Sequence, residues 1–221
     1  MRNIDPLRTM AEGIEKRVAT PELRDLLLRY ATYNGSNPYS APATLNCIAW
    51  VELGMGCYGV EGGLYEISRA LERVARSNGA KFRFDTSVLK IRTKNGAISG
   101  LETAGDTHDF DAVVVNADVR HLVRELLPHD ANTGLKADRE PSMSGWNAVI
   151  KARRRDQQTR APHHVLFPTN YDNEFADIFR NEVPPRVPTV YLCAQEKAHR
   201  REGWEEHEPL FVMANAPPEP E

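Results

Sequence analysis

Cysteine is scarce in this sequence, and its few copies lie far apart. Cys47, Cys57 and Cys193 form an odd set with no C-x-x-C pair. This spacing argues against a disulfide framework and against a zinc site. We therefore expect a reduced, cytoplasmic chain without a metal.

Long apolar runs and blocks of one charge are also missing. No apolar stretch approaches the ~18 to 20 residues of a membrane span, and the N-terminus lacks the apolar centre of a signal peptide. The net charge of −3 is spread over both signs, which argues against a nucleic-acid partner. Any contact with a membrane is expected to be peripheral. The basic stretch at residues 151–155 suits anionic lipid head groups, and its alternative is a solvated strand end.

The N-terminal third of the sequence is typical of helices. Residues 6–31 have leucines at helical spacing, with Thr20 and Pro21 in a cap-then-proline start. The run at residues 42–53 predicts a second, largely buried helix. Residues 64–77 place apolar side chains on one face and end before Gly79, as amphipathic helices do.

The pattern then changes to strands. Residues 81–85 alternate, and Asn95-Gly96 between two further runs predicts a hairpin. The unbroken apolar run at residues 112–115 is typical of a buried strand in an α/β sheet. A short helix is expected at residues 119–127. Strands around residues 144–154, 163–168, 189–197 and 209–217 predict a second sheet, interrupted by a helix at 172–183.

Several long motifs resemble one family. YNGSNPYSAPATL, GVEGGLYEISRALERVA, VVVNAD, HHVLFP and YDNEFADIF occur in the order found in the phytoene desaturases, which are FAD-dependent carotenoid desaturases related to the flavin amine oxidases. The resemblance covers about residues 25–217. It is nearest to the branch that acts on hydroxylated or methoxylated (methoxyneurosporene-type) carotenoids.

The resemblance implies a mixed α/β (α+β) fold. Residues 1–55 would be the helical part of a substrate domain, and residues 56–127 a partial, Rossmann-like FAD-binding domain. Residues 128–221 would supply the sheet-rich part of the substrate domain, with a mixed or antiparallel sheet.

The resemblance also implies cofactor-binding residues. Gly62 and Gly63 would let the main chain pass close to the flavin, since glycine has no side chain and tolerates positive φ; the alternative is an ordinary loop before a helix. Val88 would present its main chain to the adenine edge, or be a plain core valine. Asn116 would lie near the nucleotide, or be a strand-end turn residue.

The implied substrate is a long hydrophobic carotenoid. Trp50, Tyr58 and Tyr65 are candidates for its tunnel, each with ordinary core packing as the alternative. We identify no catalytic base. His163 and His164 do not predict a metal site, because neighbouring side chains on a strand point to opposite faces.

Two features of the family pattern are missing. The G-x-G-x-x-G fingerprint that holds the FAD pyrophosphate is absent, as is the family's C-terminal flavin segment. We therefore expect a central fragment of a desaturase, with FAD bound in the full-length protein and weakly or not at all by this chain alone. The alternatives are a non-catalytic remnant or binding module, or another flavoprotein of the superfamily such as a retinoid saturase or an amine oxidase.

Overall fold

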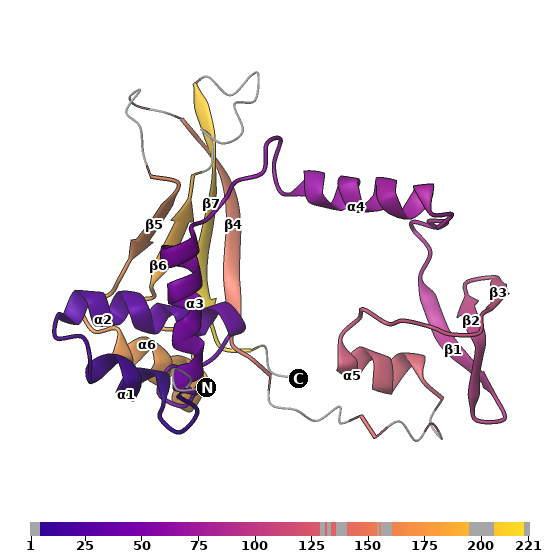
Figure 1. Cartoon of the computed structure of the whole chain (residues 1–221), viewed down its shortest axis with the longest axis horizontal. Helices are drawn as coiled ribbons and strands as arrows, with labels where there is room; N and C mark the ends of the chain where they lie inside the picture. Colours follow the sequence, from indigo (N-terminus) through magenta and orange to yellow (C-terminus); the bar gives the residue numbers. More distant parts are fainter. Residues whose placement is uncertain are drawn as a thin grey trace. The chain divides into compact units, whose positions relative to one another are not determined.

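The computed structural model describes residues 5–128, 131, 134–135, 141–153, 155, 161–194 and 206–218. The chain forms two compact units: unit 1 from residues 1–72 and 141–221, and unit 2 from residues 73–140. Because the boundary falls inside helix α4 (Tyr65–Ser77), that helix has residues in both units. Figure 1 traces the elements of each unit along the chain.

Unit 1 begins with short helical segments. They are α1 (Met10–Glu15), α2 (Pro21–Leu28), η1 (Arg29–Asn34), η2 (Ala43–Leu45), α3 (Asn46–Trp50) and η3 (Val51–Met55). Thr9 caps α1 in a capping box with Glu12, whose amide donates to the Thr9 hydroxyl at 3.2 Å. The predicted start of α2 at Thr20 and Pro21 is confirmed. It also divides the helical stretch expected at residues 6–31, because Thr20 adopts the extended backbone that a following proline requires.

The rest of unit 1 is a four-stranded antiparallel sheet with one further helix. The strand order is β4-β7-β6-β5. The elements are β4 (Ser144–Arg153), β5 (His163–Leu166), α6 (Asp172–Ala176), η5 (Asp177–Asn181), β6 (Val190–Cys193) and β7 (His207–Ala216). These strands and the interrupting helix confirm the sheet predicted for the second half of the chain. Residues 129–130, 132–133, 136–140, Arg154 and 195–197 of the expected elements lie outside the described residues.

The core of unit 1 lies among its helical segments, which Figure 1 places at one end of the sheet. Met10 and Ile14 of α1 are buried together with Tyr30, Tyr171 and Phe175, and the last two rings lie 4.9 Å apart. Burying such apolar side chains stabilises a fold by about 1.5–3 kcal/mol each. This cluster therefore holds the helical segments of unit 1 together.

A buried carboxylate connects α6 to the sheet. Glu174 is 1% exposed and accepts hydrogen bonds from the Thr189 amide at 2.7 Å and the Thr189 hydroxyl at 2.5 Å. Its other oxygen accepts from the Asn215 side-chain amide of β7 at 2.8 Å. Three donors on one carboxylate compensate for taking its charge out of water.

Unit 2 contains a three-stranded antiparallel sheet of order β1-β2-β3. Its elements are β1 (Val88–Lys94), β2 (Ala97–Thr103), β3 (Asp106–Asp109), α5 (Val119–His121) and η4 (Leu122–Leu126). The predicted hairpin is confirmed, with φ of 52° at Asn95 and 76° at Gly96. Strand β3 was not predicted, because its sequence DTHD has no apolar alternation.

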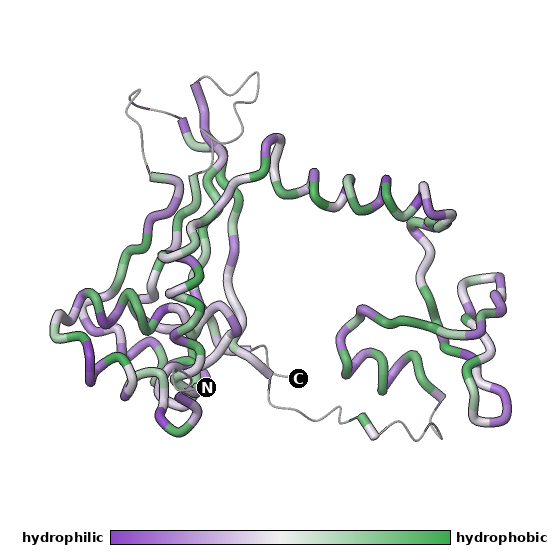
Figure 2. Tube along the Cα trace, in the orientation of Figure 1, coloured by the Kyte–Doolittle hydropathy of each residue, from purple (hydrophilic) through white to green (hydrophobic). Residues whose placement is uncertain are grey.

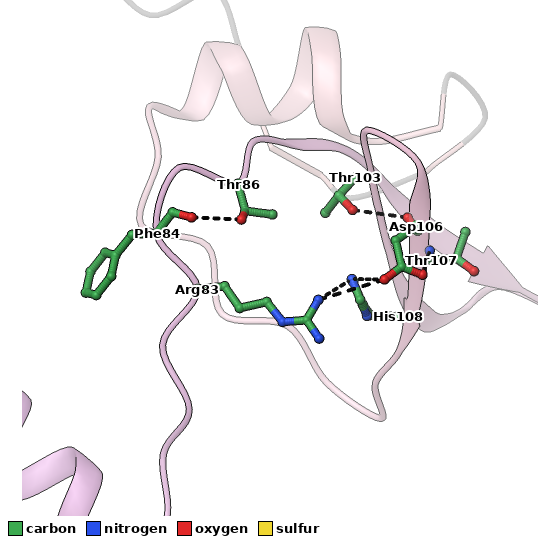
Figure 3. Close-up of polar contacts among 7 residues, drawn as sticks. All are labelled: Arg83, Phe84, Thr86, Thr103, Asp106, Thr107 and His108. Atoms are coloured by element: carbon green, nitrogen blue, oxygen red, sulfur yellow. Dashed lines mark hydrogen bonds and ion pairs between the residues drawn. The ribbon is translucent and has the colours of Figure 1, made fainter.

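The segment before β1 is attached to β3 (Figure 3). Arg83 donates to Nε2 of His108 at 2.8 Å and lies 4.0 Å from Asp106, whose carboxylate accepts from the Thr107 amide at 3.0 Å. The Thr103 hydroxyl donates to the Asp106 carbonyl at 3.2 Å. These contacts hold the chain that leads into Val88.

Two predicted strands are wrong, and one predicted helix is wrong in part. Residues 112–115 form no strand, and Val114 is 96% exposed, because the sheet of unit 2 pairs only β1 to β3 and offers this run no neighbour. Residues 81–85 are not a strand either, since Asp85 has a φ of 52° that breaks extended backbone. The helix at residues 42–53 is present, but it is not largely buried, because Trp50 and Leu53 are each 67% exposed. The core contacts the side of this helix that carries small residues instead.

Candidate functional site

The candidate site begins where α3 continues into the π-helical turn η3 and the glycine segment, residues 54–63, follows. The turn ends at Gly56, with φ 87° and ψ 165°. Single π-helical turns are frequent at functional sites. Of the π-helical turns η3, η4 and η5, η3 is the one followed by the glycine segment.

A carboxylate in η3 holds two tyrosines. The Tyr30 hydroxyl donates to Oε1 of Glu52 at 2.9 Å, and the Tyr33 hydroxyl donates to Oε2 at 2.8 Å. Burial, followed by the bond to Glu52, raises the pKa of both tyrosines. Glu52 thus fixes the end of the helix against η1. Sequence reasoning missed these contacts, although the i,i+3 spacing of the two tyrosines placed them on one helix face.

A cation links these tyrosines to the sheet. The Arg29 guanidinium lies 5.5 Å from the centre of the Tyr33 ring and 5.1 Å from that of Tyr191 in β6. The Tyr191 hydroxyl lies 2.7 Å from Nδ1 of His163 in β5. Helix η1 and the sheet therefore meet through stacked cationic and aromatic groups.

The predicted glycine pair ends the glycine segment. Gly62 and Gly63 have φ of 82° and 102°, which residues with side chains rarely adopt. The Gly63 amide donates to the Val60 carbonyl at 2.9 Å, and the Gly63 carbonyl accepts from the Glu66 amide at 3.0 Å at the start of α4. Gly62 is exposed, whereas Gly63 is buried. The main chain at Gly62, which no side chain covers, therefore faces solvent.

The three aromatic residues predicted to line a tunnel are exposed in unit 1. Trp50, Tyr58 and Tyr65 are 67%, 87% and 67% exposed. The Tyr58 hydroxyl donates to the Met55 carbonyl at 3.2 Å, and the Tyr65 ring lies 5.2 Å from the Arg69 guanidinium. The alternative reading, ordinary core packing, does not hold for them in unit 1.

The other two predicted cofactor residues belong to unit 2. Val88 is the first residue of β1, where it pairs with Thr103 and is half-buried. Asn116 is exposed and follows the run that forms no strand. The structure thus groups Trp50, Tyr58, Tyr65 and the glycine pair in unit 1, and Val88 with Asn116 in unit 2.

Helix α4 leaves the glycine pair with an apolar stripe. Leu64, immediately before the helix, and Ile67, Leu71 and Val74 within it are each exposed, and Figure 2 shows green and purple positions alternating around α4. Among the described residues, no helix combines the length and the apolar character that crossing a bilayer requires.

Comparison with known proteins gives a consistent result. The sequence matches the family described as Flavin containing amine oxidoreductase over residues 9–172. It is 36% identical over 202 residues to a protein named 1-hydroxycarotenoid 3,4-desaturase from Flavobacterium sp. (strain P99-3), covering 91% of this chain and 41% of that protein. It is 34% identical over 220 residues to the hydroxyneurosporene desaturase of Rubrivivax gelatinosus, covering 98% of this chain and 42% of that protein.

One solved structure has the same fold. An oxidoreductase from Methanosarcina mazei superposes with a TM-score of 0.63 at 19% identity, covering 96% of this chain and 48% of that one. The mixed fold of helices and antiparallel sheets is therefore as predicted. The chain spans about two fifths of the length of the two named desaturases. Its family match covers most of its own length, and the chain belongs to the flavin containing amine oxidoreductase family.

Proposed function

We propose that this chain supplies the substrate contacts and the flavin-facing glycine segment of an FAD-dependent carotenoid desaturase. The observation that carries the proposal is the glycine pair at positive φ, which lies in the segment between the helix that presents Trp50 and α4. Membership of the family and the names of the two relatives support a polyene substrate.

The residues present fit a planar cofactor. Any side chain at Gly62 would be strained by its φ of 82°, and an added Cβ would lie 3.1 Å from Cγ of Glu66. The bare main chain that results is what close approach of an aromatic ring system needs. Gly62 and Gly63 would contact the flavin ring, and Val88 and Asn116 the nucleotide part.

FAD bound in the full-length protein would supply the two-electron oxidation, in which one carbon of a C–C unit of the polyene gives up a hydride and its neighbour a proton, so that the unit becomes a double bond. The chain's own part is binding and orientation. Trp50, Tyr58 and Tyr65 present exposed rings for apolar contact with a polyene and for excluding water from it. Glu52 keeps the helix end in place through its two tyrosines, and both its oxygens already accept a hydrogen bond.

A chimera tests the proposal. This chain would replace the matching segment of the Rubrivivax gelatinosus desaturase, and the purified product would be assayed for flavin absorbance and for conversion of hydroxyneurosporene. We expect both in the chimera. A Gly63→Val chimera should lose flavin, whereas Gly79→Val should keep it, because Gly79 has a similar positive φ and so carries comparable backbone strain but lies outside the glycine segment.

A chimera that folds but has no activity would refute the proposal, as would equal flavin content in the Gly63→Val and Gly79→Val forms. For the chain alone we expect weak or no FAD binding, since the sequence has no phosphate-binding glycine fingerprint. Absorbance titration and a thermal shift with FAD measure this directly.

A further inference from the structure

A cavity of about 550 Å³ lies between the first helices of unit 1. Its walls are mainly apolar, with Ile14, Val18, Leu27 and Ala49 among them. A volume of this order suits a small molecule or one end of a longer one. None of the residues assigned to the flavin lines it.

One polar group on the cavity wall is available to a ligand. The Asn46 side-chain amide has no hydrogen-bond partner within the described residues. It sits beside Gly13, where an added Cβ would lie 3.2 Å from Nδ2 of Asn46 and 3.1 Å from Cβ of Ala43. The missing side chain at Gly13 therefore leaves room next to a free amide that can both donate and accept a hydrogen bond.

The charges at the cavity favour a neutral ligand. Arg17 and Asp5 both line it, and Arg17 already donates to the Gly13 carbonyl at 2.9 Å. A hydrogen bond from Arg8, supported by the charge of Arg17, holds the pKa of Asp5 below its usual value. Each lining charge therefore already has a partner, Arg8 for Asp5 and the Gly13 carbonyl for Arg17, and a neutral ligand displaces neither of them.

The cavity also adjoins the glycine segment. Trp50 lines the cavity, and its indole lies 3.7 Å from where a Cβ on Gly54 would be. A chain-like ligand with one end in the cavity would pass this indole on its way to the glycines.

We propose that the cavity binds the hydroxylated end of an acyclic carotenoid, with the Asn46 amide bonded to the hydroxyl. The proposal rests on the proposed function and adds the group that the site recognises. The apolar walls would hold the terminal isoprene units, and the amide would distinguish an end with a hydroxyl from one without. Both relatives compared above carry names of desaturases that act on hydroxylated carotenoids.

Two cysteines allow a test on the full chain without flavin. Cys47 is exposed and lines the cavity, whereas Cys57 is exposed outside it and Cys193 is buried. The probe is 2,6-dimethyloctan-2-ol, compared with 2,6-dimethyloctane and 3,7-dimethyloctanoic acid. The rate of alkylation by N-ethylmaleimide at each cysteine is followed by mass spectrometry.

We expect the alcohol to slow alkylation of Cys47 and to leave Cys57 unchanged. At ten times its Kd the slowing should be about tenfold by mass action. Replacing Asn46→Leu should raise the protective concentration of the alcohol by about threefold to tenfold, the value of one hydrogen bond. Asn170→Leu, an exposed asparagine that does not line the cavity, is the matched control. An unreactive Cys193 shows in every variant that unit 1 is folded.

Three results would overturn the proposal. Equal protection by the alcohol and the hydrocarbon would mean that the hydroxyl is not recognised. Stronger protection by the acid would mean that Arg17 selects a carboxylate. No protection by any probe would mean that the cavity is not a ligand site. Since no outcome depends on flavin or turnover, a failure here is separate from a failure of the chimera.

Discussion

The hydrogen bonds around Glu174 support a quantitative prediction about the sheet of unit 1. In Glu174→Gln, the amide oxygen can keep the two donors of Thr189, while the amide nitrogen replaces the oxygen that faces Asn215. Asn215 can turn its own amide to accept from it. The substitution should therefore lower the free energy of unfolding by about 1–2 kcal/mol, because charge-assisted hydrogen bonds are replaced by neutral ones.

The partner substitution should behave differently. Asn215→Asp places a second carboxylate against that of Glu174, where a donor stood 2.8 Å away. It should cost about 2 kcal/mol or more. In the double variant, the new glutamine amide donates to the new aspartate, and a charge-assisted bond is restored. The double variant should therefore be more stable than the sum of the two single changes predicts, by at least about 1 kcal/mol.

Urea unfolding, followed by tryptophan fluorescence, measures all four proteins. Trp146 in β4 pairs with Ala214, next to Asn215, and reports on this part of the sheet. Glu15→Gln is the control, because Glu15 is exposed and should change stability by less than about 0.5 kcal/mol. Additivity of the two changes within about 0.5 kcal/mol would show that the carboxylate and the amide are not coupled, and would refute the reasoning.

Other predictions follow from single contacts. Thr9→Ala should lower the free energy of unfolding by about 1 kcal/mol in urea melts, since it removes the cap of α1, and an unchanged midpoint would contradict the capping box. Gly100→Ala should cost about 2 kcal/mol or more and weaken amide protection in β2 and β3, because its Cβ would lie 2.0 Å from the His108 carbonyl. Stability should fall above about pH 10, where the unfolded chain releases tyrosine protons that the folded chain keeps, since burial and Glu52 raise the pKa of Tyr30. Tyr30→Phe should flatten that fall in urea midpoints taken at pH 8 and 10.5, and an identical slope would count against it.

The helices and strands of unit 1 were largely accessible from the sequence because their signals are local. Thr20-Pro21 and the alternating runs of β4 to β7 depend only on neighbours in the chain. The run at residues 112–115 shows the limit of such reasoning. Its composition suits a strand, but a strand also needs a partner, and the sheet of unit 2 gives it none.

The candidate site was predictable only in part, for the same reason. The glycine pair could be identified from its residue type, and its positive φ is as expected. The contacts of Glu52 with two tyrosines join positions 22 and 19 residues apart, which no periodicity indicates. Likewise, nothing in the sequence marks Gly13 and Asn46. Only the packing of α1 against α3 places the Asn46 amide next to Gly13, which has no side chain.

Unit 1 is built from two stretches of sequence separated by unit 2, and this has a consequence during synthesis. The Tyr39 hydroxyl bonds to Asp172, which lies 133 residues further along the chain. At about 5–20 residues per second, the ribosome needs roughly 7 to 27 seconds to make the second partner after the first. For that time the N-terminal helices have no sheet to pack on, and their apolar side chains are open to chaperones and to other nascent chains. Slow codons or a scarce chaperone in this interval would lower the yield of folded protein without altering any residue.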